Sequence, residues 1–241
     1  MRTPLILLIL SLFITSCFKR DESNVNAPCN SGCMTFITRV TTGQNSSEPV
    51  DNAVVELSWA WPATPFGNPG RLIAKGRTGS DGMIVFNFKA NEEELEGGRY
   101  MISAKKGLDY FQQHNQYYGI QRFDTTVNAD VHLPSKATVR IVYRNFQPVA
   151  PDDFFQCLPG FQTYGSMPIA VELTDQSGNP QNGFFFNHSP EFTEKILNGA
   201  TAGDQYTYFT ITKKRNGVRE DVKDSIFIPK GGIGVYEVSY N

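Results

Sequence analysis

The stretch Ala53-Val54-Val55-Glu56-Leu57-Ser58-Trp59-Ala60-Trp61 decides the fold class of this 241-residue sequence. Its large apolar side chains, Val55, Leu57, Trp59 and Trp61, occupy every second position, which is the period of a β-strand. Similar short runs, rich in β-branched and aromatic residues and bounded by Gly, Pro, Asn or Asp, follow one another along the chain. They cover 35–42, 72–77, 83–88, 100–105, 126–133, 138–143, 169–174, 183–187, 206–213, 225–229 and 235–240. This pattern predicts an all-β protein built from β-sandwiches, with one helical turn at 91–96.

A domain boundary is expected at Leu133-Pro134-Ser135, because proline ends one strand and a new alternating run starts at Thr138. We therefore predict two immunoglobulin-like or transthyretin-like sandwiches, the first over 34–134 and the second over 135–241. The residue identities of the two halves show no convincing repeat.

Turn signals separate the expected strands. Asp81-Gly82 predicts a tight turn with a positive φ at the glycine, and Asn216-Gly217 predicts the tip of a hairpin. Ser177-Gly178-Asn179-Pro180 is a further turn signal.

The first domain also resembles a known family. Pro49 to Leu57 carries proline and alanine into a strand, and Thr78 to Phe86 carries a glycine turn into a strand with an aromatic end. This arrangement resembles the carboxypeptidase-regulatory-like, or transthyretin-like, sandwich. Gly79 stands where that family has an acid, and Asp81 lies one residue before the glycine. The resemblance implies a transthyretin-like fold from about Met34 to Leu133.

The N-terminus has the features of a signal peptide. Arg2 precedes an uncharged apolar run from Leu5 to Ile14, which is too short to span a bilayer comfortably. The run ends in Ile14-Thr15-Ser16-Cys17, which resembles the bacterial lipobox. That resemblance implies cleavage after residue 16, acylation of Cys17 with fatty acids such as palmitate, and stable membrane anchoring by several acyl chains. The alternative is an ordinary secretory signal with an incidental cysteine.

The residues after Cys17 predict where the protein goes. Phe18 is followed by Lys19-Arg20-Asp21-Glu22, which resembles the surface-export signal of Bacteroidetes lipoproteins. The alternative is a solvated tether, and the composition of 17–33 suits a tether in either case. The succession of lipobox, transthyretin-like domain and second all-β domain also looks like surface lipoproteins of Bacteroidetes. We expect an outer-membrane protein that is lipid-anchored at the cell surface.

The remaining cysteines leave their pairing open. Cys29 and Cys33 flank a short Asn-Ser-Gly loop that could close on itself, or one of them could reach Cys157. Three sulfurs with no histidine nearby in sequence do not make a zinc site.

The sequence lacks the patterns of the common catalytic sites. His114, His132 and His188 show no metal-ligand spacing, and no nucleophile elbow, P-loop or dinucleotide fingerprint is present. The adjacent acids Asp152-Asp153 and Glu220-Asp221 do not form a glycosidase pair. We therefore predict no catalytic residue, no metal, no cofactor and no enzymatic activity; a hydrolase is the disfavoured alternative.

Aromatic and amide side chains gather in two expected loops. The stretch from Asp109 to Tyr118 is one of these loops, and Trp61 leads into the other. Rings with nearby amides suit the stacking and hydrogen bonding of sugars or peptides. The alternative is packing onto the sandwich rim, since Trp61 shares a face with Val55 and Leu57. The candidate ligand-binding residues are Trp61, Tyr110, Tyr117 and Tyr118.

These observations predict a non-enzymatic, membrane-anchored lipoprotein that displays β-sandwich binding or structural modules at the bacterial envelope. The alternative is an accessory glycan-binding surface lipoprotein. The expected partners are the membrane, through the lipid anchor, and a glycan or an envelope protein. Nucleic acid is excluded, because 22 basic side chains against 24 acidic ones leave no basic field.

Overall fold

The computed structural model describes residues 29–61, 70–112, 116–163 and 168–241. The expected signal peptide, the expected lipidation site at Cys17 and most of the tether lie outside the described residues. In the described part the chain is almost entirely β-structure, which confirms the predicted fold class.

The first domain contains two sheets. One sheet joins β2 (Glu48–Pro49), β1 (Cys33–Thr42) and β5 (Met83–Lys89), and β8 (Thr125–His132) pairs with the other edge of β1. The second sheet has the order β4 (Gly70–Arg77), β3 (Val54–Ala60), β6 (Arg99–Lys105) and β7 (Gln116–Tyr118). Two short helices, η1 (Gln44–Ser46) and α2 (Glu93–Glu96), connect these strands.

The second domain also contains two sheets. One has the order β13 (Pro180–Gln181), β12 (Leu173–Thr174), β15 (Phe192–Ala202), β9 (Lys136–Phe146) and β18 (Ile233–Ser239). The other has the order β11 (Ile169–Ala170), β10 (Phe154–Phe161), β16 (Gln205–Arg215) and β17 (Val218–Ile228), and β14 (Phe184–Phe186) pairs with β10.

The two domains repeat one strand topology. In the first, β1 pairs antiparallel with β5 and parallel with β8, while β3 lies between β4 and β6 and β6 pairs with β7. In the second, β9 pairs antiparallel with β15 and parallel with β18, while β10 lies between β14 and β16 and β16 pairs with β17. The halves are therefore two copies of one fold, although their residue identities show no repeat.

Each sandwich has its own core, formed by the inward side of the alternating strands. In β3, Val55 and Leu57 are fully buried and Trp59 is nearly so, as its alternation predicts. In β16, Thr207, Phe209 and Ile211 are buried, while the residues between them are exposed or face the outer side. The buried hydrophobic residues form one cluster from Met34 to Leu133 and another from Ala137 to Tyr240.

The turns follow the sequence signals. Gly82 has a φ of 73°, and the hairpin tip between β16 and β17 has φ values of 50° at Asn216 and 78° at Gly217. Asp81 accepts a hydrogen bond from the backbone of Met83, which fixes the first of these turns.

Some expected strand bounds are wrong. β17 starts at Val218 and not at 225, and the expected strand 169–174 is divided into β11 and β12. β10 and β15 form where the sequence pattern predicts no strand.

A network of contacts, which we call the junction, fixes the two domains end to end. Backbone hydrogen bonds run from Gln44 to Asp204 (2.8 Å) and from Lys136 to Asp109 (2.7 Å). The buried Ser135 donates from its backbone to the Thr42 hydroxyl at 3.1 Å. The junction comprises 42–46, 109–111, 132–136, 203–206 and Lys230.

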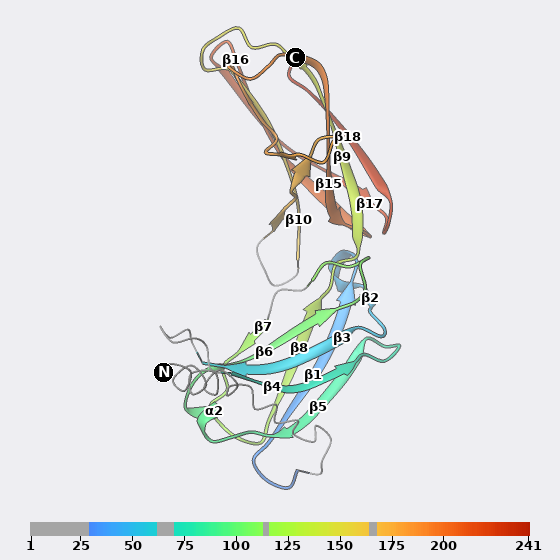
Figure 1. Cartoon of the computed structure of the whole chain (residues 1–241), viewed down its shortest axis with the longest axis vertical. Coiled ribbons are helices and arrows are strands. Elements are labelled where there is room, and N and C mark those ends of the chain that lie inside the picture. The colour runs from blue at the N-terminus through green and yellow to red at the C-terminus, as the bar shows by residue number, and fades with distance from the viewer. Residues whose placement is uncertain (1–28, 62–69, 113–115, 164–167) are drawn as a thin grey trace, which may run out of the picture.

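The junction gives the molecule its elongated shape (Figure 1), with the C-terminus at the far end of the second domain. Cys33 lies at the opposite end of the ten-residue β1 from Thr42 in the junction, a distance of roughly 30 Å at about 3.3 Å per residue. The chain therefore enters the first domain at the end that faces away from the second.

Candidate functional site

The predicted ligand-binding residues of the first domain do not form one surface. Trp61 is half-buried, and its ring lies against Gly97, where an added Cβ would come within 2.0 Å of it. It also packs edge-on against Trp59, at 5.6 Å between ring centroids. Tyr110 lies in the junction, where its hydroxyl accepts a hydrogen bond from Lys230 Nζ at 2.7 Å. These two rings help to hold the fold together.

Tyr117 and Tyr118 are neighbours on β7 and point to opposite faces of their sheet. Tyr118 packs edge-on against Phe36 in the first core, and burial raises the pKa of its hydroxyl. Tyr117 points outward and is 55% exposed. Of the four candidates, Tyr117 thus has the most exposed ring.

The cysteines take defined positions. A disulfide joins Cys29 to Cys33 at the start of β1, so the short loop closes on itself. Cys157 is free and fully buried in β10, and burial raises the pKa of its thiol to about 12. An unreactive thiol in a core has a packing role.

The structure separates the adjacent acids. Asp152 pairs with Lys214, while the buried Asp153 accepts backbone hydrogen bonds from Val149, Ala150 and Asn216. Burial alone would raise the pKa of Asp153, but these backbone donors outweigh it and hold the pKa below its usual range.

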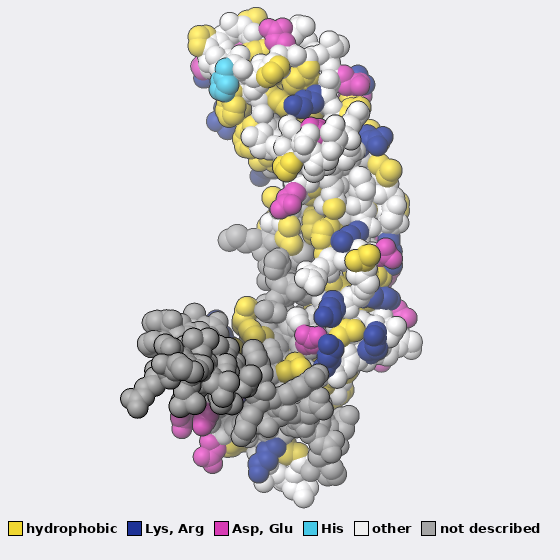
Figure 2. All heavy atoms as spheres, viewed as in Figure 1, with side chains coloured by type: hydrophobic (Ala, Val, Ile, Leu, Met, Phe, Trp, Pro, Cys, Tyr) yellow, Lys and Arg dark blue, Asp and Glu magenta, His cyan; other side chains and the backbone are white. Residues whose placement is uncertain are grey.

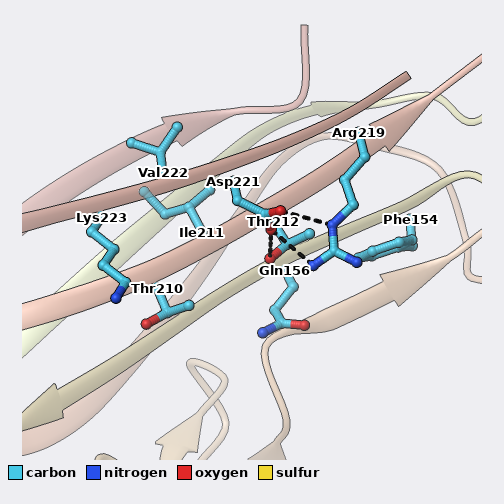
Figure 3. A pocket seen from close by; sticks show the side chains of 9 residues that line it. All are labelled: Phe154, Gln156, Thr210, Ile211, Thr212, Arg219, Asp221, Val222 and Lys223. Carbon is cyan, nitrogen blue, oxygen red and sulfur yellow. Dashed lines mark hydrogen bonds and ion pairs between the residues drawn. The ribbon is translucent and has the colours of Figure 1, made fainter. Parts of the chain in front are cut away.

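An open groove of about 640 Å³ lies on the outer face of the sheet β10–β16–β17 in the second domain (Figure 3). Thr210 and Thr212 of β16 and Gln156 of β10 form its polar floor. These residues share a face because Gln156 pairs with Thr212 across the two strands and strand side chains alternate. The remaining side chains around the groove are Phe154, Ile211, Arg219, Asp221, Val222 and Lys223.

A fixed hydrogen-bond array forms one wall of the groove. Arg219 donates to both carboxylate oxygens of Asp221, from Nε at 2.8 Å and from Nη2 at 3.0 Å. The Thr212 hydroxyl donates to the same carboxylate at 2.8 Å. The Arg219 guanidinium, and then the Thr212 hydroxyl, hold the pKa of Asp221 below its usual range. In Figure 3 the guanidinium extends over the floor toward the ring of Phe154.

Exposed aromatic rings continue the face of the groove in both directions. Beyond Phe154 lie Phe184 and Phe186 of β14, with ring planes within 8° of parallel, and the ring of Phe186 stacks on His188 within 4°. In the other direction along β16 come Tyr208 and Tyr206, each 42% exposed. Phe227 of β17 is 49% exposed and packs edge-on against Tyr206. The face thus has a polar centre with rings at either side.

This arrangement is suited to binding and not to acid–base catalysis. Asp221 is the single carboxylate among the described residues around the groove, and its ion pair keeps it charged at neutral pH. General acid catalysis by a carboxyl group needs a raised pKa, whereas that of Asp221 is lowered. No group of three His, Cys, Asp or Glu residues that could hold a metal exists in the described part of the chain.

One pattern in the sequence indicates this face, and it lies in a strand and not in the predicted binding loops. Tyr206, Tyr208, Thr210 and Thr212 alternate along β16, opposite to a buried apolar row. Exposed aromatic residues in such a row mark a surface that does not pack into the core. The contributions of Phe154 and Arg219 depend on strand pairing and could not be seen in one segment.

No helix in the described residues is long and apolar enough to cross a bilayer. Figure 2 shows one face of the molecule, with Lys and Arg side chains gathered near the middle of its length. At the junction, the amino groups of Lys106 and Lys230 lie 5.4 and 4.5 Å from the ring centroid of Tyr110.

Comparison with known proteins gives remote likenesses. The sequence matches no family model and no curated protein. Among solved structures, the Bacillus anthracis TIE protein is 13% identical with a TM-score of 0.33, and the match covers 86% of this chain and 34% of that one. The chain thus spans about a third of the length of that protein.

Two further solved structures are similar at the same level. The shaft pilin SpaA from Lactobacillus rhamnosus GG is 9% identical, covers 87% of this chain and 97% of its own, and has a TM-score of 0.30. A fimbrial protein from Bacteroides ovatus is 6% identical, covers 88% of this chain and 51% of its own, and has a TM-score of 0.25. With TM-scores this low, the function proposed below rests on the residues of this chain alone.

Proposed function

We propose that this chain is a non-enzymatic lipoprotein, anchored by acylated Cys17 in the outer membrane at the cell surface. It displays two β-sandwich domains and binds an extracellular ligand through the groove of the second. The observation that carries this proposal is the end-to-end arrangement of the domains, with chain entry at one end and the groove in the domain beyond the junction.

The arrangement supports display because it holds the groove away from the anchor. A tether that enters at Cys33 leaves the whole first domain between the membrane and the junction. The junction contacts add stiffness, since a chain linked only by a flexible segment could fold back onto the surface. A protein with this geometry presents its second domain to the medium.

The anchor is tested by replacing Cys17→Ala and growing cells with labelled palmitate. The label should disappear from the protein, and the protein should leave the membrane fraction. The control is the double variant Cys29→Ser/Cys33→Ser, which removes two other thiols and should keep both the label and the membrane location. A Cys17→Ala protein that still carries label contradicts the proposal.

Surface location has its own test. Protease added to intact cells should digest the wild-type protein, and neutral residues in place of Lys19 to Glu22 should reduce digestion while leaving the palmitate label unchanged. Full protection of the wild type, with digestion after the cells are lysed, would place the protein on the periplasmic side.

A further inference from the structure

We propose that the groove on β10–β16–β17 binds an acidic polysaccharide, a sugar chain that carries carboxylate groups. This inference names the ligand of the proposed display function and rests on that function for its biological setting. Three features of the groove support it: its backbone, its charge and its rings.

The backbone under the floor of the groove is paired on both sides, and the free edge of this sheet lies beside the floor, on β17. β10 lies between β14 and β16, and β16 lies between β10 and β17, whereas β17 ends the strand order and pairs with β16 alone. A peptide that binds by strand addition needs an open edge for its main-chain hydrogen bonds. Such a peptide would lie along β17, beside the floor. Recognition on the floor itself comes from side chains, which favours a ligand that presents hydroxyl groups and ring faces.

The charge of the groove favours an anion. Arg219 and Lys223 line it against the single acid Asp221, which leaves one positive charge in excess. Lys223 is exposed and forms no ion pair within the described residues. Arg219 uses Nε and one Nη2 hydrogen on Asp221, so its other N–H groups remain to meet a ligand carboxylate.

The two cationic side chains are also spaced for a polymer. They lie four residues apart on β17 and on the same side of the strand, so their Cα atoms are about 13 Å apart at about 3.3 Å per residue. Two cations along one strand suit a chain with repeated carboxylates.

The rings beside the polar centre suit sugars. Tyr208 follows Thr210 along the outward face of β16, and Phe154 lies across the groove from it along the strand direction. Ring faces stack on the apolar faces of sugars, while fixed polar groups bind the hydroxyls. Because the Arg219–Asp221–Thr212 array is already held by its own hydrogen bonds, binding costs little ordering of these side chains.

The experiment uses the full mature lipoprotein in detergent micelles and measures binding by calorimetry. The probes are polygalacturonate, alginate and hyaluronate, with fully methyl-esterified polygalacturonate as the uncharged control of the same backbone. Poly-glutamate serves as a polyanion that is not a sugar. We expect binding to at least one acidic polysaccharide, weakened at least tenfold by methyl-esterification and weakened by salt.

Variants assign the binding to the groove. Lys223→Gln should weaken binding by at least fivefold, and Lys89→Gln, an exposed lysine of the first domain, should leave it unchanged. Tyr208→Ala should weaken binding by at least fivefold, and Tyr208→Phe should restore most of it because the ring is kept. Circular dichroism and melting temperature confirm that each variant remains folded.

Each contrary result overturns the inference. No binding to any of the three acidic polysaccharides refutes it, as does equal binding to the methyl ester or to poly-glutamate. Binding that survives both Lys223→Gln and Tyr208→Ala places the ligand elsewhere. These failures leave the palmitate label and the protease digestion of intact cells unchanged, so they are distinguishable from a failure of the proposed anchoring and display.

Discussion

His132 is a buried, titratable side chain at the place where the two domains meet. It is 2% exposed at the end of β8, its Nδ1 lies 3.2 Å from the Ser46 hydroxyl, and Gln205 of the second domain bonds to it. Burial is the main cause that lowers its pKa from 6.5 to about 4, while the hydrogen bond with Gln205 opposes the shift. The folded protein therefore keeps this imidazole neutral where an unfolded chain protonates it.

This difference predicts an acid-sensitive stability. Because the folded pKa lies below the unfolded one, the unfolded state takes up the proton first as the pH falls from 6.5 toward 4. The contribution is present in full above pH 6.5, and about 3 kcal/mol should be lost by pH 4. Urea unfolding at several pH values measures it. His132→Gln should be less stable at pH 7 but lose less stability with acid; an equal pH dependence in both proteins contradicts the prediction.

At the scale of single elements, the turn from 79 to 83 depends on one glycine. Gly82 has a φ of 73°, and an added Cβ would lie 2.6 Å from the Val40 carbonyl oxygen and 3.0 Å from Cβ of Pro49. Gly217 in the β16–β17 hairpin has a similar φ of 78°, but nothing lies within 4 Å of its Cβ position. Alanine substitutions at the two glycines therefore distinguish the energetic cost of a positive φ from the additional cost of a steric clash.

We predict that Gly217→Ala costs about 1 kcal/mol, the strain of a positive φ. Gly82→Ala should cost about 1–3 kcal/mol more, because it adds a clash with backbone atoms that cannot rotate away. Denaturant unfolding of both variants gives the difference. Equal losses would show that the first turn moves aside freely.

Some strands can be predicted from their own sequence, and others cannot. β3 and β16 have one buried row and one outward row, so period-2 alternation predicts them. β10 contains Pro159, which argues against a central strand. The residue is tolerated because its missing N–H faces the gap between β14, which pairs with 154–156, and β11, which pairs with 160–161.

The same limit applies to the groove. The alternation within β16 is enough to predict that the rings of Tyr206 and Tyr208 face outward, and this inference needs no information from another strand. Arg219 falls in a half of β17 that reads as polar loop, so its place beside Phe154 depends on pairing across three strands. For the first domain, the sequence predicts binding residues in the aromatic loops. A loop position alone does not distinguish a ring that packs against the core from one that is exposed.

At the scale of the whole molecule, the junction makes one rod from two domains. Phe111 contributes a ring 4.9 Å from that of Phe161, and Tyr110 contributes its hydrogen bond to Lys230. Both residues come from the connection between β6 and β7 of the first domain and contact the second. Their removal should free the domains without disturbing either core, since neither belongs to the fully buried set.

We predict that the double variant Tyr110→Ala/Phe111→Ala keeps its β-sheet circular dichroism but samples a wider range of domain orientations. Small-angle X-ray scattering should show a broader distance distribution with a shifted maximum dimension. Tyr117→Ala, which removes an exposed ring outside the junction, is the control and should leave the scattering unchanged. Identical scattering from all three proteins would show that the remaining backbone contacts alone hold the domains.

The parallel pairing of β8 with β1, and of β18 with β9, determines when each half can fold as the chain emerges from the ribosome. The first half has all its strands once residue 132 has emerged, whereas the second lacks an edge of β9 until residues 233–239 are out. Folding of the second half therefore waits for its final strand, at a time when the first half can already be complete.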